Sequence, residues 1–153
     1  MASSSASRDT GKLTDSPNRL LGAVFGVVYL LVGLLGFVYT GFQEFAGNNT
    51  NEKILGIFEV NPLHNIAHLL IGALLLFSAM KGVAAAKGSN VLVGAVYLVL
   101  GIIGLFIANN TSDLNILSLN GADNVLHLAS AALLLGVGLS QDKNVRRDSP
   151  ING

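Results

Sequence analysis

Long apolar segments alternate with short polar segments along the whole chain. Residues 20–39 contain no charged side chain, and a helix of that length spans about 30 Å, the thickness of a bilayer core. Three further apolar segments follow. The pattern predicts an all-α membrane protein whose four transmembrane helices cover about residues 20–40, 62–80, 91–109 and 121–140.

The charges between these segments predict the orientation of the chain. Every Lys and Arg except Lys53 lies before the first predicted helix, between the second and the third, or after the fourth. Basic loops remain in the cytoplasm according to the positive-inside rule. We therefore expect a multi-pass protein of the plasma membrane with both termini in the cytoplasm. Residues 1–19 and 141–153 are largely polar and are expected to be disordered cytoplasmic tails.

The second half of the chain repeats the pattern of the first half. Tyr29 aligns with Tyr97, and His68 aligns with His127, when the corresponding helices are compared. Each half contains a helix, an outer loop and a returning helix, so both halves would enter the membrane from the same side. The sequence thus predicts two tandem helical-hairpin repeats with parallel topology, related by a pseudo-twofold axis along the membrane normal.

Glycines recur on one face of the first and the third predicted helix. Small residues at such positions let helix backbones approach closely in lipid. One interpretation is tight packing within the bundle, and the other is self-association of two chains through a glycine face. The glycines assigned to helix packing are Gly26, Gly33, Gly94 and Gly101.

Composition limits the classes of function. Hydrophobic residues make up 51% of the chain and charged residues 12%, and the formal net charge is zero. No basic stripe with interleaved aromatic residues is present, so nucleic acid is not an expected partner. The absence of cysteine excludes disulfides, cysteine-based zinc sites and thiolate catalysis. The expected surroundings are the lipid bilayer.

The second and the fourth predicted helix begin with similar polar motifs. Asn61 followed by Pro62 is a helix start, because Asn caps free N–H groups and Pro suits the first helical position. Asn120 would cap the fourth helix in the same way. Structural polar or capping roles are assigned to Asn61, Asn65, Asn120 and Asn124.

All three histidines of the chain lie in these two motifs. His64 and His68 share one helical face, and so do Asp123 and His127. His68 and His127 are expected about 10 Å below the outer surface, where ionisable side chains usually face the bundle interior. If the hairpins pack together, three imidazoles and a carboxylate converge into a ligand set for Zn²⁺ or a similar divalent ion.

Three other interpretations of the histidines remain open. In the first, His68 and His127 are axial ligands of a haem, and Gly72 and Ala131 leave space for the porphyrin. In the second, the histidines take part in a proton relay. In the third, they hydrogen-bond to Asn65, Asn124 or the backbone and hold the two repeats together without a cofactor.

Tyr29 and Tyr97 are expected near the middle of the membrane. Helical side chains lean toward the N-terminus of their helix, which here points these tyrosines away from the histidines. We expect them to form hydrogen bonds inside the bundle, for example with Ser130.

A longer stretch around the first motif resembles a known family. Residues 54–72 contain Asn61-Pro62-Leu63-His64-Asn65 followed by His68, and this run is similar to the hallmark of the bacterial family catalogued as domain of unknown function 4383. The resemblance covers about residues 20–140. It implies a small four-span protein of the bacterial inner membrane, and it implies no activity. The second copy of the motif has Asp123 where the first has a histidine.

The sequence favours a non-enzymatic function. It contains no zinc-protease motif, nucleophile–base pair or paired carboxylates that would indicate a reaction. The leading interpretation is a structural or accessory bundle that binds a membrane protein partner or forms a homo-oligomer. The alternatives are a metal- or haem-binding membrane protein that uses the His/Asp cluster, and a small transporter or channel that works as an oligomer.

Overall fold

The computed structural model describes residues 11–47, 52–108 and 113–143. Its elements are a short 3₁₀ helix, four α-helices and two short antiparallel strands that pair Lys53 with Glu59 and Ile54 with Phe58. In chain order they are η1 (Leu13–Asp15), α1 (Pro17–Thr40), β1 (Lys53–Ile54), β2 (Phe58–Glu59), α2 (Pro62–Lys81), α3 (Val83–Ile107) and α4 (Gly121–Ser140).

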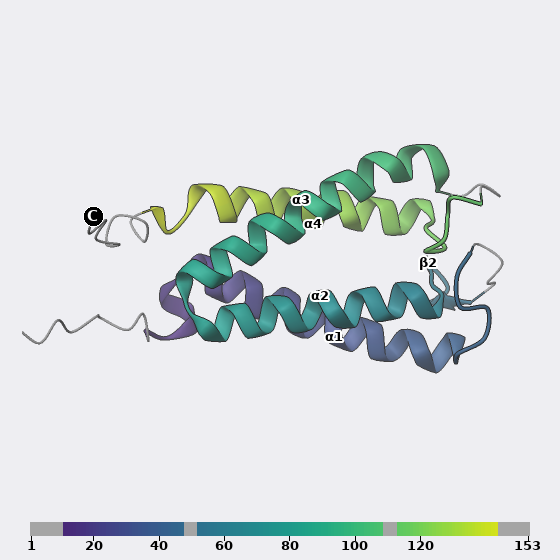
Figure 1. Ribbon diagram of the computed structural model, residues 1–153, viewed down its shortest axis with the longest axis horizontal. Helices are drawn as coiled ribbons and strands as arrows, with labels where there is room; N and C mark the ends of the chain where they lie inside the picture. Colours follow the sequence, from purple (N-terminus) through teal and green to yellow (C-terminus); the bar gives the residue numbers. More distant parts are fainter. Residues whose placement is uncertain (1–10, 48–51, 109–112, 144–153) are drawn as a thin grey trace, which may run out of the picture.

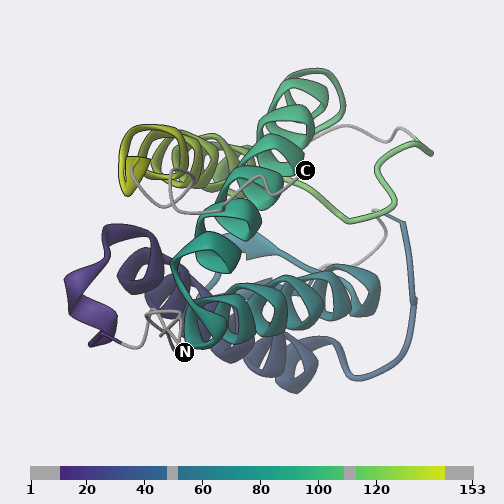
Figure 2. The ribbon, with the colours of Figure 1, turned by 60° about the vertical axis from the view of Figure 1, so that its left-hand side comes forward.

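The helices form two antiparallel hairpins that pack against each other. α1 packs mainly on α2, and α3 packs mainly on α4. Figure 1 shows the α1–α2 pair below the α3–α4 pair, with the start of α1 and the end of α4 at one end of the bundle and the small sheet at the other. From a second direction, α4 lies above α1 and α3 lies above α2 (Figure 2).

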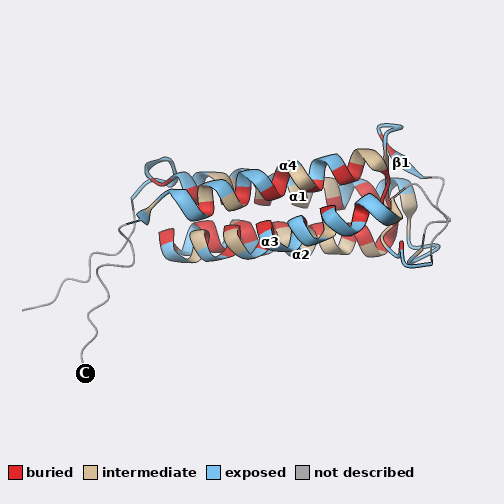
Figure 3. Ribbon diagram, turned by 90° about the horizontal axis from the view of Figure 1, so that it is seen from above, coloured by how far each residue is buried: buried red, intermediate tan, exposed pale blue. Residues whose placement is uncertain are grey.

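The bundle has the surface of a membrane protein. In the described part of the chain, four helices are long and apolar enough to cross a membrane, which confirms the predicted all-α, four-span membrane class. Large apolar side chains such as Leu31, Leu70 and Phe77 are exposed, whereas Asn61, Asn65 and Asn90 are fully buried. Buried positions lie where the helices face one another, and exposed positions line the outside (Figure 3).

Glycines bring the two helices of each hairpin into close contact. A Cβ atom at Gly26 of α1 would lie 2.7 Å from the backbone nitrogen of Leu76 in α2. A Cβ atom at Gly94 of α3 would lie 2.9 Å from the backbone nitrogen of Leu135 in α4. Gly33 and Gly101 extend the same two contact faces. These faces are covered within the chain, so the glycines contribute to packing inside each hairpin.

The third helix begins earlier than the sequence predicted. α3 starts at Val83, so the expected start near residue 91 is wrong, and most of the expected loop between α2 and α3 is helical. The turn consists of Gly82 alone, whose φ of 143° lies in a region that favours glycine. Ala84, Ala85 and Ala86 follow directly, and Ala is the strongest helix former.

Part of the expected disordered tails belongs to the folded body. α1 begins at Pro17 because Ser16 caps it, accepting a hydrogen bond from the backbone N–H of Arg19 at 3.2 Å. Asn18 and Arg19 are buried, and Arg19 Nε donates to the carbonyl of Ala79 in α2. Residues 1–10 and 144–153 lie outside the described residues.

Asp142, which follows α4, links the C-terminal end of α4 to the start of α1. One of its carboxylate oxygens accepts hydrogen bonds from Ser16 Oγ at 2.8 Å, from Asn18 Nδ2 at 2.9 Å and from the Asn18 backbone N–H at 3.2 Å. Burial acts to raise the pKa of Asp142, but the hydrogen bonds from Asn18 and Ser16 and the charge of Lys87 hold it below its usual value. The carboxylate form is therefore the one that stabilises this contact.

We predict that Gly26→Ala lowers the thermal unfolding midpoint in detergent. The new Cβ collides with the backbone of α2, and overpacking of this kind costs about 1–3 kcal/mol. The matched control is Gly136→Ala on α4, where a Cβ meets nothing within 4 Å. That variant should be as stable as the wild type or more stable, because Ala is about 1 kcal/mol more favourable than Gly in a helix. Equal losses in both variants would contradict the proposed packing.

A second prediction concerns Asp142→Asn. At pH 7 this variant should be less stable than the wild type by about 0.5–1 kcal/mol, the lower part of the range for helix caps, since the contact is partly exposed. A depressed folded-state pKa gives stability that is present above the unfolded-state value of about 4 and is lost as pH falls through the folded-state pKa. The difference between the unfolding midpoints should therefore narrow below about pH 4. The control is Asp113→Asn. A difference between the unfolding midpoints of the wild type and Asp142→Asn that is the same at every pH would contradict the role of the carboxylate.

Candidate metal centre

The start of α2 is fixed by the side chain of Asn61. Its backbone is extended, with φ −134° and ψ 170°, and its side-chain oxygen accepts a hydrogen bond from the His64 N–H at 2.8 Å. Pro62 occupies the first helical position. The Asn61 Nδ2 group donates to the carbonyls of Gly47 at 2.9 Å and Ile116 at 2.8 Å. Asn61 thus caps its own helix and binds a loop of the other hairpin.

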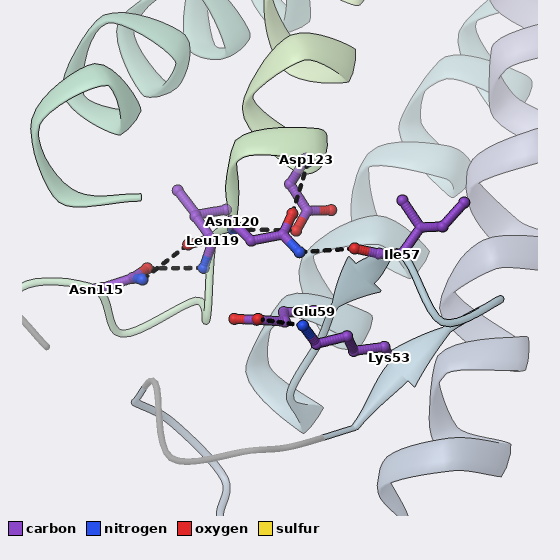
Figure 4. Close-up of polar contacts among 7 residues, drawn as sticks. All are labelled: Lys53, Ile57, Glu59, Asn115, Leu119, Asn120 and Asp123. Carbon is purple, nitrogen blue, oxygen red and sulfur yellow. Dashed lines mark hydrogen bonds and ion pairs between the residues drawn. The ribbon is translucent and has the colours of Figure 1, made fainter. Parts of the chain in front are cut away.

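Asn120 has the equivalent position at the start of α4. It accepts a hydrogen bond from the Asp123 N–H at 3.0 Å, and Asp123 Oδ2 accepts one from the Asn120 N–H at 3.2 Å. The two residues form a capping box. Figure 4 shows the Asn120 amide reaching the carbonyl of Ile57, a hydrogen bond of 2.7 Å to the other hairpin. The two caps therefore connect the hairpins reciprocally.

Neighbouring contacts hold the loops that the caps bind. Asn115 accepts a hydrogen bond from the Leu119 N–H at 2.7 Å and donates to the Leu119 carbonyl at 2.9 Å. Lys53 Nζ lies 3.0 Å from Glu59 Oε1 across the strand pair. Figure 4 shows both contacts beside Asn120. The N-terminal ends of α2 and α4 are thus fixed relative to one another, and the first turns of the two helices lie side by side.

The three histidines converge below these caps. His64 and His68 come from consecutive turns of α2, and His127 comes from α4. Each offers a ring nitrogen, and the three atoms lie within 4.8 Å of one another. The ring centroids of His64 lie 4.5 Å from His68 and 5.9 Å from His127. All three side chains are buried, with 2%, 7% and 5% of their surface exposed, respectively.

These imidazoles lack hydrogen bonds among the residues that the structure describes. Both ring nitrogens of His64 are buried without a partner, and so is Nδ1 of His68 and of His127. The backbone of Glu59 and of Leu117 lies near His64, but neither ring nitrogen of His64 forms a full hydrogen bond with it. Buried polar atoms are nearly always paired, because leaving one unpaired costs free energy. The cluster therefore has the donor atoms of a ligand site.

Asp123 lies close by but belongs to the helix cap. Its carboxylate is buried and accepts the Asn120 N–H, as Figure 4 shows. The group of ligand atoms within reach of one ion contains the three histidines without Asp123. The expected set of three imidazoles and one carboxylate is therefore reduced to three imidazoles.

Asn65 and Asn124 do not serve as partners for the histidines. Asn65 Nδ2 donates to Thr40 Oγ1 at 3.0 Å, and a Cβ on Gly36 would overlap the Asn65 amide. A Cβ on Gly104 would overlap the amide of Asn124 in the same way. Each amide oxygen thus faces a glycine Cα–H on the neighbouring helix, a weak hydrogen bond common between packed helices. Each of these asparagines therefore connects the two helices of its own hairpin.

The two tyrosines lie against the histidines, which corrects the expectation that they point away. The rings of Tyr29 and His68 are stacked with centroids 5.5 Å apart, and those of Tyr97 and His127 with centroids 5.0 Å apart. Tyr29 also donates to Ser130 Oγ at 2.8 Å, as expected. The expectation failed because it considered each helix alone. α1 has 24 residues and α2 has 20, so the position of a tyrosine along its own helix does not give its depth relative to a histidine on another helix.

Comparison with known proteins adds the family of the chain. No curated protein and no solved structure shows significant similarity to it. The model of the family described as domain of unknown function (DUF4383) matches residues 19–140, which include all four helices except the first two residues of α1. This range contains every histidine of the cluster. The chain therefore belongs to the DUF4383 family, as its first polar motif predicted.

Proposed function

We propose that this protein binds a divalent transition-metal ion inside the membrane through His64, His68 and His127. The observation that carries the proposal is the convergence of three buried ring nitrogens within 4.8 Å. Imidazole nitrogen is a preferred ligand of Zn²⁺ and Cu²⁺. Three histidine ligands leave a coordination position open, which is the pattern of catalytic rather than purely structural zinc sites.

A purely structural role explains the histidines less well. In that role, the imidazoles would hydrogen-bond to Asn65, Asn124 or the backbone, whereas most of their buried ring nitrogens have no such partner in the described residues. In lipid, a polar atom without a partner is costly, since no water replaces the missing hydrogen bond. A bound metal ion would satisfy these nitrogens. It would also join α2 to α4 and thereby the two hairpins.

A haem is a weaker candidate than a single ion. The porphyrin was expected to use the space beside Gly72, but α1 fills that space. A Cβ on Gly72 would lie 2.8 Å from the Gly26 carbonyl oxygen and 2.8 Å from the Leu30 nitrogen.

The reciprocal contacts support the proposal that the hairpins are tandem repeats with the same topology. Asn61 bonds to Ile116, and Asn120 bonds to Ile57, so each cap contacts the equivalent loop position of the other hairpin. The stacked tyrosine–histidine pairs are equivalent as well. With basic residues at the opposite end of the bundle, this arrangement favours cytoplasmic termini and an outward-facing metal site in the inner membrane of a bacterium.

We predict near-stoichiometric metal binding by protein purified without a polyhistidine tag. After equilibration with Zn²⁺ or Cu²⁺, elemental analysis should find about one ion per chain in the wild type, because three histidine ligands suffice for a site. His64→Gln and His127→Gln should weaken binding by more than about 100-fold, the upper loss for residues that only support a ligand.

The control for this experiment is Asp123→Asn, which should keep the metal because Asp123 caps α4 and is not part of the histidine cluster. Added metal should raise the thermal unfolding midpoint of the wild type and of this control, and of neither Gln variant, since a ligand stabilises only the state that binds it. A wild type without metal and without a thermal shift would refute the proposal.

A further prediction tests the orientation. The chain has no cysteine, so a single introduced cysteine can be labelled selectively. In intact bacterial cells, a membrane-impermeant maleimide should label Ile57→Cys in the outer loop, where 53% of Ile57 is exposed. It should label Gln141→Cys, which follows α4 at the other end, only after the cells are broken. Labelling with the opposite preference would reverse the orientation.

A further inference from the structure

A cavity of about 350 Å³ lies beside the histidine cluster. Its walls come from α1, α4, His68 of α2 and residues 54–60 around the strand pair. Figure 2 shows α4 above α1, and these two helices touch at few positions. This volume is in the range of about 300–1,000 Å³ that is usual for small-molecule sites. The cavity is therefore large enough for a ligand much bigger than a metal ion or a water molecule.

The polar side chains of this cavity are neighbours of its two histidines, because Tyr29 stacks on His68, and Asp123 and Ser130 lie one turn before and one turn after His127 on α4. The cluster and the cavity share His68 and His127, whereas His64 does not line the cavity. Asp123 and Ser130 lie beside them. The rest of the lining is apolar except for Tyr29, and it contains no Lys or Arg. A ligand here would be mostly apolar, with oxygen or nitrogen atoms at one end.

The rim of the cavity faces the surrounding lipid. Val24, Val28 and Leu126 line the cavity and are also exposed on the outside of the bundle, with 51%, 47% and 49% of their surface accessible. Since these residues lie within the membrane-spanning segments of α1 and α4, a ligand can reach the cavity directly from the bilayer. The ligand is therefore a membrane-soluble molecule.

We propose that this cavity binds a bilayer-soluble molecule with a neutral, flat ring that carries carbonyl or hydroxyl oxygens, of the quinone class. Phe25, Tyr29 and Phe58 line the walls, and aromatic walls favour a flat ring over a flexible acyl chain. Asp123 in the lining disfavours a carboxylate head group, and without a lining cation an anionic phospholipid head group has no partner. His68, His127 and Ser130 are the uncharged polar residues beside Tyr29 in a lining that is otherwise almost wholly apolar, so the ring oxygens would lie against them.

This inference rests on the proposed function only in that His68 and His127 would serve both ligands. They would bind the metal ion with one ring nitrogen and border the cavity beside it. The open coordination position of a three-histidine site would then lie next to the ring of the bound molecule. His64, which is outside the cavity lining, separates the two sites experimentally.

The test uses a fluorescent reporter, because the chain contains no Trp. Phe25→Trp places an indole in the cavity wall, and the matched control Phe77→Trp places one on the outer face of α2, where 67% of Phe77 is exposed. Decylubiquinone is titrated into each full-length protein in detergent. Quenching should saturate in Phe25→Trp, whereas in Phe77→Trp it should rise linearly with the quinone concentration in the micelle.

Two further variants in the Phe25→Trp background complete the experiment. Val28→Phe narrows the cavity and should abolish the saturable quenching, while Val99→Phe on the lipid-facing side of α3 should preserve it. Palmitate should not compete with the quinone. Linear quenching in Phe25→Trp, or displacement of the quinone by palmitate, would overturn the proposal.

Metal content is measured on the same preparations, so that the two proposals fail separately. Saturable quenching without metal in the wild type would refute the metal site and leave the cavity assignment in place. Stoichiometric metal with linear quenching would do the reverse. Adding His64→Gln should remove the metal and keep the saturable quenching, because His64 belongs to the cluster and not to the cavity.

Discussion

The lack of water in a bilayer governs this structure, because every polar group must find its partner inside the protein. Accordingly, asparagines lie between the helices, whereas leucines, valines and phenylalanines lie on the outside. Asn18 and Asn90 illustrate this at one end of the bundle, where Asn90 Nδ2 donates to the carbonyl and to the side chain of Asn18, both at 3.0 Å. Asn61 and Asn120 do the same at the other end.

The contacts within each hairpin differ in kind from the contacts between the two hairpins. Within a hairpin, glycines allow the backbones to touch, and Asn65 and Asn124 face glycines on the neighbouring helix. Between the hairpins, few backbones approach closely, and hydrogen bonds from the helix caps contribute instead. The looser packing of α1 against α4 leaves room for a cavity.

The histidine cluster holds four of the buried polar atoms that lack a hydrogen-bond partner in the described residues; the others are single atoms of Asn65, Asn90, Tyr97 and Asn124. Its ring nitrogens are buried, close together and unpaired in the described part of the chain. The same surroundings that make such atoms costly would also strengthen the proposed binding of a metal ion, since no water would compete for the ligands. Stacking of Tyr29 and Tyr97 on two of the imidazoles fixes the ring planes, which reduces the reorganisation that metal binding would require.

Local features of the sequence determined the helices and their caps. Apolar length predicts a transmembrane helix without knowledge of its neighbours, and Asn61-Pro62 predicts a helix start because capping involves only adjacent residues. The family followed from the same local motif. The start of α3 was missed because a single glycine, Gly82, makes a turn that the apolar pattern does not show.

Only the tertiary structure decided which side chains meet. The rotation and relative depth of packed helices depend on the lengths and crossing of all four, and no local pattern contains them. For this reason the sequence grouped Asp123 with the histidines, whereas the fold uses it as a cap. For the same reason it directed Tyr29 away from His68, and it gave no sign of the cavity between α1 and α4. Helices are encoded locally, but a site built from several of them depends on their packing.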